Sequence, residues 1–75
     1  MSSSITKTIR LSGKAEGSIE DAVRTVLARA ASTISDIGRF AVVEVGGEVD
    51  NSGAPTYFSV TLDITFGIKD PVEHG

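Results

Sequence analysis

The clearest alternation of apolar and polar residues in the chain begins at Thr56. Apolar side chains occupy the even positions Phe58, Val60, Leu62, Ile64, Phe66 and Ile68. The odd positions are mostly polar, namely Tyr57, Ser59, Thr61, Asp63, Thr65 and Gly67. Because successive side chains of a strand point to opposite faces, this alternation predicts one long strand whose even face is buried.

A second periodicity, with apolar residues three and four positions apart, predicts one amphipathic helix over Ile19–Ser35. Its apolar positions are Ile19, Val23, Val26, Leu27, Ala30, Ala31 and Ile34. The Ser18 hydroxyl can accept a free backbone N–H of the first turn, and Asp21 favours the positive end of the helix. We expect Gly38 to close the helix in the left-handed conformation.

Two further segments have the composition of strands. Ile5–Leu11 alternates apolar and polar residues with Lys7 as the exception, and the glycines of Ser12–Gly17 predict a turn and loop after it. Phe40–Val45 is rich in β-branched residues and runs on to Val49 through Gly46-Gly47, which indicates a bulge or a close backbone approach. The turn residues of Asp50–Pro55 then predict an antiparallel hairpin.

The order strand, helix, strand, strand predicts an α+β fold, a three-stranded antiparallel sheet packed on one amphipathic helix. With 75 residues, the chain is one domain over 1–75, and we expect 1–4 and 70–75 to be flexible tails. The other face of such a sheet and its edges are uncovered. We therefore expect the protein to associate with itself as a symmetric homo-oligomer.

Composition narrows the function classes. The formal net charge is −3 with scattered bases, so nucleic acid is not an expected partner. The absence of cysteine excludes disulfides and a cysteine nucleophile. No apolar run approaches the length of about 20 residues that a membrane span needs, and Met1–Ser4 lacks the features of a secretory signal. We expect a cytoplasmic protein with no membrane partner.

Few residues offer chemistry. His74 is the only histidine and lies in the predicted tail, and no motif for nucleotide binding or hydrolysis occurs, so we do not expect an enzyme. Four acids on or beside the hairpin make a site for a hard cation such as Ca²⁺ conceivable, although their spacing matches no known loop, so no metal ligand is assigned. They are Glu44, Glu48, Asp50 and Asp63. Arg39 is accessible at the junction between the helix and the second strand.

Five segments and one aromatic residue together resemble the dodecins, which are small flavin-binding proteins. They are Ile9–Gly13, Ser18–Val23, Leu27–Ala30, Phe40–Val45, Tyr57–Leu62 and Phe66. The resemblance covers about Thr6 to Lys69, nearly the whole chain. It implies a protomer of strand, helix, strand, strand, twelve of which form a hollow sphere of cubic symmetry.

The resemblance also implies a function and a site. In the family, flavin (riboflavin or FMN) lies in stacked pairs at two-fold axes, between tryptophans at the start of the second strand. A glutamine of the third strand hydrogen-bonds the ring edge, and the proposed role is flavin storage and protection. Here Arg39 and Ser59 occupy these two positions, and the chain has no tryptophan. We expect both residues to bind ligand, with flavin held more weakly.

Other hypotheses share the fold. Two Arg39 side chains facing each other across a two-fold axis repel unless an anion lies between them, which favours a ligand bearing phosphate or carboxylate. A cage that collects metal ions at its symmetry axes, with no flavin function, is a third hypothesis. Arginine can stack its planar guanidinium on a ring, so an altered flavin pocket remains compatible with the sequence.

Overall fold

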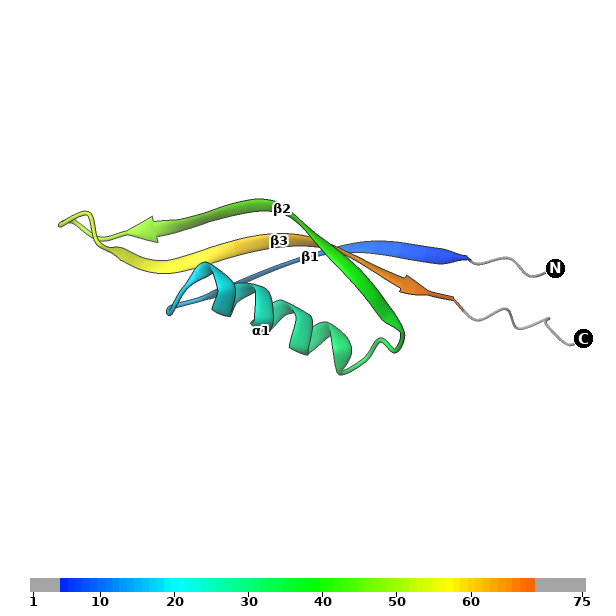
Figure 1. Ribbon diagram of the computed structural model, residues 1–75. Coiled ribbons are helices and arrows are strands. Elements are labelled where there is room, and N and C mark those ends of the chain that lie inside the picture. Colours follow the sequence, from blue (N-terminus) through cyan, green and yellow to red (C-terminus); the bar gives the residue numbers. More distant parts are fainter. Residues whose placement is uncertain (1–4, 69–75) are drawn as a thin grey trace, which may run out of the picture.

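The computed structural model describes residues 5–68, and the predicted tails lie outside them. The element order is β1 (Thr6–Ala15), α1 (Ile19–Ala31), β2 (Ile37–Val49) and β3 (Pro55–Gly67). The three strands form one antiparallel sheet, and α1 lies across one of its faces (Figure 1). The predicted fold class and element order are therefore confirmed.

The strand with the clearest alternation, β3, lies in the middle of the sheet. The order is β1-β3-β2, so β3 pairs with both neighbours while β1 and β2 form the edges. Its even face is buried as predicted, because Leu62 and Ile64 are completely inaccessible and Val60 is nearly so. As the central strand, β3 has a partner along both of its edges, so its backbone N–H and C=O groups are paired on both sides.

The core consists of two short rows of side chains. Ala22, Val26 and Ala30 of α1 face Val60, Leu62 and Ile64 of β3. Two residues of the predicted helical stripe, Val23 and Leu27, are only half-buried beside this row. The small alanines at the contact let the helix lie close to the sheet. The buried face of α1 is therefore centred on Ala22, Val26 and Ala30 and not on the larger side chains of Val23 and Leu27.

The N-terminus of α1 is as predicted, and its C-terminus is not. The Ser18 Oγ accepts a hydrogen bond of 3.0 Å from the backbone N–H of Asp21. The helix ends at Ala31, four residues before the predicted end, with Ser32 as its C-cap. The left-handed residue is Asp36, at φ 64°, while Gly38 belongs to β2. Aspartate adopts this conformation more readily than most residues, so the closing glycine is not needed.

β1 continues through residues for which the glycines predicted a loop. Its last four residues, from Ser12 to Ala15, pair in register with Thr61 to Phe58 of β3. Gly13 lies under the helix, where an added Cβ would come within 2.5 Å of a Val26 methyl group. The glycine therefore marks a close approach of helix and sheet, and the predicted boundary at Leu11 is wrong because pairing with β3 overrides local propensity.

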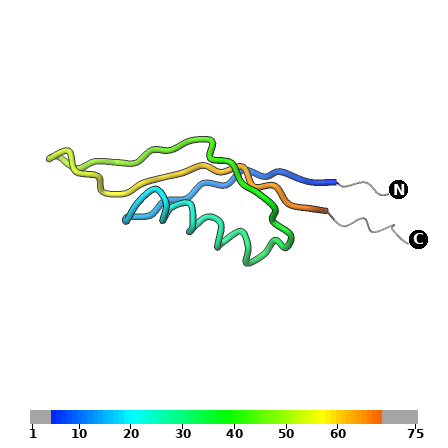
Figure 2. The backbone as a smooth tube through the Cα atoms, in the orientation of Figure 1, coloured from blue at the N-terminus to red at the C-terminus, as the bar shows by residue number. Residues whose placement is uncertain are grey.

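The predicted hairpin between β2 and β3 is confirmed, and it extends well beyond the helix (Figure 2). Its turn is held by Asp50, whose Oδ1 accepts hydrogen bonds from the backbone N–H of Ser52 at 2.8 Å and of Ala54 at 3.1 Å. The Ser52 hydroxyl donates a third, at 2.7 Å. The register of β2 shifts at three places, the middle one between Val42 and Glu44.

The glycine pair in β2 yields a matched test of this hairpin. A Cβ on Gly47 would lie 2.4 Å from the Tyr57 carbonyl oxygen, whereas one on Gly46 would meet only the Ser59 Oγ at 3.5 Å. We expect Gly47→Ala to lower the free energy of unfolding by about 1–3 kcal/mol, because backbone must move. Gly46→Ala is the control, with a change within about 0.5 kcal/mol. Equal urea midpoints for the two variants would contradict this approach of β2 to β3.

The Asp50 carboxylate makes the turn sensitive to acid. Its pKa is lowered from 3.8, first by the hydrogen bond from the Ser52 hydroxyl and then by the Ala54 N–H. A lowered native pKa means that the contribution to stability is present above the unfolded pKa and is lost as the pH falls through the native value. We expect acidification from about pH 6 to about pH 3 to weaken the turn in the wild type. In Asp50→Asn this weakening by acid should be absent. The NMR amide shifts of residues 50–54, followed over the same pH range in both proteins, measure it.

The face of β2 on the helix side is left uncovered. α1 packs on β1 and β3, so Phe40, Val42 and Val45 are 45%, 44% and 48% exposed although they pair with core residues. The radius of gyration is 16.3 Å, against about 11 Å for a compact domain of this size. In residues 5–68 no helix is long and apolar enough to cross a membrane. The chain from residue 5 to residue 68 is thus elongated, and within it the apolar face of β2 has no partner.

Candidate ligand-binding site

The face of the sheet away from α1 is polar and has cross-strand pairs of side chains. The hydroxyls of Thr8 and Thr65 share a hydrogen bond of 2.9 Å, and those of Ser12 and Thr61 share another of 2.9 Å. These pairs arise because β1 and β3 are in a register that places their polar positions opposite each other. We call this surface the helix-free face.

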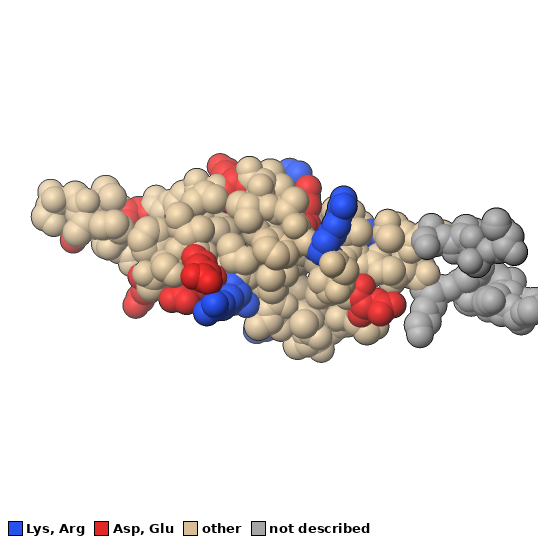
Figure 3. Space-filling model, viewed as in Figure 1, with Lys and Arg blue, Asp and Glu red and all other residues tan. Residues whose placement is uncertain are grey.

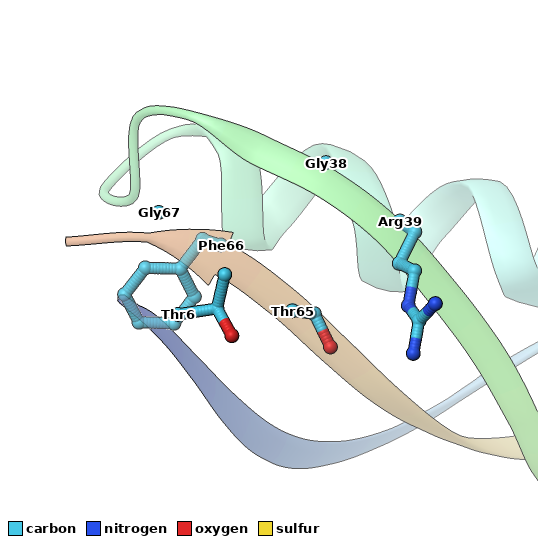
Figure 4. Close-up of a pocket in the computed structure, with 6 residues that line it drawn as sticks. All are labelled: Thr6, Gly38, Arg39, Thr65, Phe66 and Gly67. Carbon is cyan, nitrogen blue, oxygen red and sulfur yellow. The ribbon is translucent and has the colours of Figure 1, made fainter. Parts of the chain in front are cut away.

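Arg39 lies at one end of the helix-free face, beside a shallow hollow of about 420 Å³ (Figure 4). The hollow is lined by Thr6, Gly38, Arg39, Thr65, Phe66 and Gly67. A register shift between Ile37 and Arg39 places Arg39 opposite Thr65, and the two side chains point the same way. Hydroxyl groups and an exposed guanidinium therefore converge on one opening.

The neighbouring ion pair does not involve Arg39. Arg10 donates two hydrogen bonds to the carboxylate of Asp63, at 2.8 Å and 3.2 Å. These bonds lower the pKa of Asp63 and raise the pKa of Arg10. Within residues 5–68 the other ion pair joins helix residues, so the Arg39 guanidinium has no carboxylate partner there. Its donors remain available to a ligand.

Ser59, the second predicted site residue, is half-buried near the other end of the same face. It lies opposite Lys14 of β1 and Gly46 of β2. It is six positions along β3 from Thr65, the partner of Arg39, a distance of about 20 Å along a strand. One chain therefore cannot bring Arg39 and Ser59 to the same ligand, and a site containing both must combine two copies.

The sequence analysis missed several residues beside the predicted pair. The Lys14 ammonium lies 4.4 Å from the centroid of the Tyr57 ring. The pKa of Tyr57 is raised, first by a hydrogen bond to Glu48. Thr6 and Thr65 line the hollow beside Arg39. The alternation of β1 and β3 already indicated that these polar side chains share one face of the sheet. Only the register between the strands shows which of them lie beside Arg39 and Ser59.

The hairpin acids do not gather into a metal site within one chain. In the part of the chain that the structure describes, no three histidine, aspartate or glutamate side chains lie close enough to hold an ion together. Asp50 is engaged by its own turn and Asp63 by Arg10. His74 lies outside the described residues.

Charges are distributed over the surface without a basic patch on the face shown. Lysine and arginine side chains there are interspersed with aspartate and glutamate (Figure 3). This mixture agrees with the net charge of −3 and offers no broad surface for a phosphate backbone. An anion that binds on this face must be recognised by individual cations.

Comparison with known proteins identifies the fold and the family. The family model described as Dodecin matches residues 5–69. A crystal structure of a Thermus thermophilus dodecin variant superposes with a TM-score of 0.83 at 28% identity, covering 91% of this chain and 100% of that one. The dodecin of Streptomyces davaonensis gives a TM-score of 0.84 at 25% identity, covering 92% and 100%.

A third similar structure is named for the ion that it chelates. It is the calcium-chelating antigen calcium dodecin of Mycobacterium tuberculosis, with a TM-score of 0.74 and 25% identity, covering 95% of this chain and 99% of that one. Among curated protein sequences, none matches this chain significantly.

Proposed function

Because this chain belongs to the dodecin family, we propose that it is a flavin-binding storage protein that acts as a symmetric homo-oligomer. It is a binding protein and not an enzyme. The assembly is the hollow dodecamer expected from the resemblance, and its location is the cytoplasm, as expected from the sequence. Its ligand is riboflavin or FMN, bound by Arg39 and Ser59.

The oligomer is supported by what the isolated chain leaves exposed. The apolar side chains of Phe40, Val42 and Val45 on β2 are nearly half exposed, and only six hydrophobic residues of residues 5–68 are buried. A small domain with so little core needs reinforcement, and here cysteines and thus disulfides are absent. Burial of β2 against further copies supplies apolar contact and covers an edge strand.

The observation that carries the ligand proposal is the position of Arg39. It is an unpaired planar cation at the rim of an open hollow, on the same sheet face as Ser59 and about 20 Å from it. A guanidinium stacks on flat heterocycles and donates in a fixed plane. Two copies meeting at this face would offer a ring a stacking surface from Arg39 and a hydroxyl from Ser59.

Native mass spectrometry and flavin titration test the proposal together. We expect a mass of twelve chains, and quenching of riboflavin or FMN fluorescence that reaches saturation. Arg39→Ala should weaken binding, because it removes the guanidinium at the rim of the hollow. A monomer at micromolar concentration would end the proposal of a cage, and unchanged fluorescence of both flavins at saturating protein would end flavin storage.

Calcium binding by the same cage is a second candidate function, favoured by the similarity to calcium dodecin. The hairpin acids of one chain do not meet, so an ion would need Glu44 or Glu48 from several copies at a symmetry axis. Calorimetric titration with CaCl₂ tests it. Saturable heat that disappears in a Glu44→Gln, Glu48→Gln variant would support this function, and no heat would exclude it.

A further inference from the structure

The single side-chain amide of this protein lies at the tip of the β2–β3 hairpin, far from the helix (Figure 2). Asn51 is the only asparagine in the sequence, and no glutamine occurs. It is followed by Ser52, a small residue, and both residues are exposed. Asparagine is a thermolabile residue, and it reacts most readily where the next residue is small. Asn51 is therefore the one position in the sequence at which deamidation can occur.

Deamidation uses the backbone nitrogen of the next residue as its nucleophile. The Ser52 nitrogen attacks the side-chain carbonyl carbon of Asn51 and forms a cyclic imide. The former amide nitrogen leaves as ammonia and takes the proton of the Ser52 N–H with it. Water then opens the imide at either of its carbonyl carbons, which yields aspartate or isoaspartate at position 51. The reaction consumes one water molecule and no other reactant.

In the folded hairpin this nucleophile is engaged by the residue before Asn51. The Ser52 N–H donates to the Asp50 Oδ1 at 2.8 Å, and the same oxygen accepts from the Ser52 hydroxyl at 2.7 Å and from the Ala54 N–H at 3.1 Å. Two backbone hydrogen bonds close the turn, from the Gly53 N–H to the Asp50 carbonyl oxygen at 3.0 Å and from the Asp50 N–H to the Ala54 carbonyl oxygen at 2.9 Å. We call these five bonds the Asp50 turn. Formation of the imide has to turn the Ser52 nitrogen toward Asn51 and so breaks into this set.

The Asp50 carboxylate holds the Ser52 proton and does not remove it. The pKa of Asp50 is lowered from 3.8, first by the hydrogen bond from the Ser52 hydroxyl and then by the Ala54 N–H. A carboxylate whose charged form is stabilised in this way is a weaker base. The hydrogen bond therefore keeps the Ser52 nitrogen from its target and does not activate it.

We propose that Asn51 is a site of spontaneous deamidation, and that the Asp50 turn keeps the reaction slow for as long as the hairpin is folded. The product places a second carboxylate beside Asp50 and takes the formal net charge from −3 to −4, because one neutral amide becomes one anion. Isoaspartate also adds a methylene group to the backbone of the turn, between Asp50 and the N–H groups that it accepts from. The reaction thus marks chains whose hairpin has opened, and it does not depend on a bound flavin.

Incubation of the full chain in warm neutral buffer tests the site, with one sample kept folded and one unfolded in urea as judged by circular dichroism. High-resolution intact mass and ion-exchange chromatography measure the conversion, and Asn51→Asp marks the elution of the aspartate product. We expect conversion in urea and conversion about tenfold slower in the folded protein. Ser52→Pro should not react even in urea, because proline has no backbone N–H.

The contribution of the Asp50 carboxylate is measured in folded protein. Asp50→Ala should deamidate about tenfold faster than the wild type, the factor equal to about 1.4 kcal/mol of lost hydrogen bonding. Glu44→Ala is the matched control, because it removes a carboxylate from β2 outside the turn and should react at the wild-type rate.

Four results would count against the inference. Absence of conversion in urea, or conversion of Ser52→Pro at the wild-type rate, would overturn the site and its chemistry. Equal wild-type rates with and without urea would overturn the protection by folding. A rate for Asp50→Ala equal to or below that of the wild type would overturn the role of Asp50, since a slower reaction means that the carboxylate acts as a base.

Discussion

Replacing Arg39 with tryptophan and Ser59 with glutamine is expected to tighten riboflavin binding by about ten- to a thousandfold. Stacking on an aromatic side chain contributes about 1–3 kcal/mol per base in nucleic-acid complexes, and one net hydrogen bond adds about 0.5–1.5 kcal/mol. At about 1.4 kcal/mol per factor of ten, the two changes together reach this range. Stacking retained by Arg39 in the wild type reduces the gain.

Fluorescence quenching of riboflavin by wild type, the two single variants and the Arg39→Trp, Ser59→Gln variant measures this gain. Arg29→Trp with Thr61→Gln is the control, because these changes place the same side chains on the helix surface and two residues along β3 from Ser59. Wild-type affinity equal to that of the double variant would mean that Arg39 is not at the stacking position.

Leu62→Ala is expected to lower the free energy of unfolding by about 2–5 kcal/mol. Leu62 is completely buried on the central strand, between Leu11 and Val42 on the neighbouring strands. Truncation leaves a cavity that β3, paired along both edges, cannot close by moving. Because the core contains so few residues, this loss is a large part of the stability of a small domain.

Urea denaturation at one fixed protein concentration measures the loss, since association contributes to the apparent stability. Arg24→Ala is the control, because Arg24 and its ion-pair partner Glu20 are both 71% exposed, and we expect a change within about 0.5 kcal/mol. Leu27→Ala should fall between the two, as Leu27 is half-buried in the isolated chain. A midpoint for Leu62→Ala that matches that of Arg24→Ala would contradict the observed core.

Local patterns were sufficient for the elements that interact mainly with their own neighbours in sequence. The alternation after Thr56 predicted β3 and its buried face, and Ser18 with Asp21 predicted the start of α1. The Asp50–Pro55 turn predicted the hairpin. In each case the signal is the spacing of apolar side chains or a hydrogen bond between residues a few positions apart. Neither depends on a residue distant in the sequence.

Boundaries were wrong where a distant partner decides them. β1 runs on to Ala15 because β3 pairs with it and Val26 leaves room only for glycine at position 13. The helix ends at Ala31, and Asp36 takes the left-handed conformation assigned to Gly38. Neither the register of β3 nor the exit path of the helix is encoded in a local window of residues.

The candidate site was likewise predictable from the sequence only in part. The resemblance singled out Arg39 and Ser59 from the sequence, but only the tertiary structure shows that they lie about 20 Å apart on one face. It also shows that Lys14 lies beside Ser59 and that Asp63 is taken by Arg10. The sequence by itself determined which side chains point to the polar face of each strand, because that follows from alternation. Which of them are neighbours was decided by the antiparallel register between strands some fifty residues apart, since long-range pairing, and not spacing along the chain, sets those contacts.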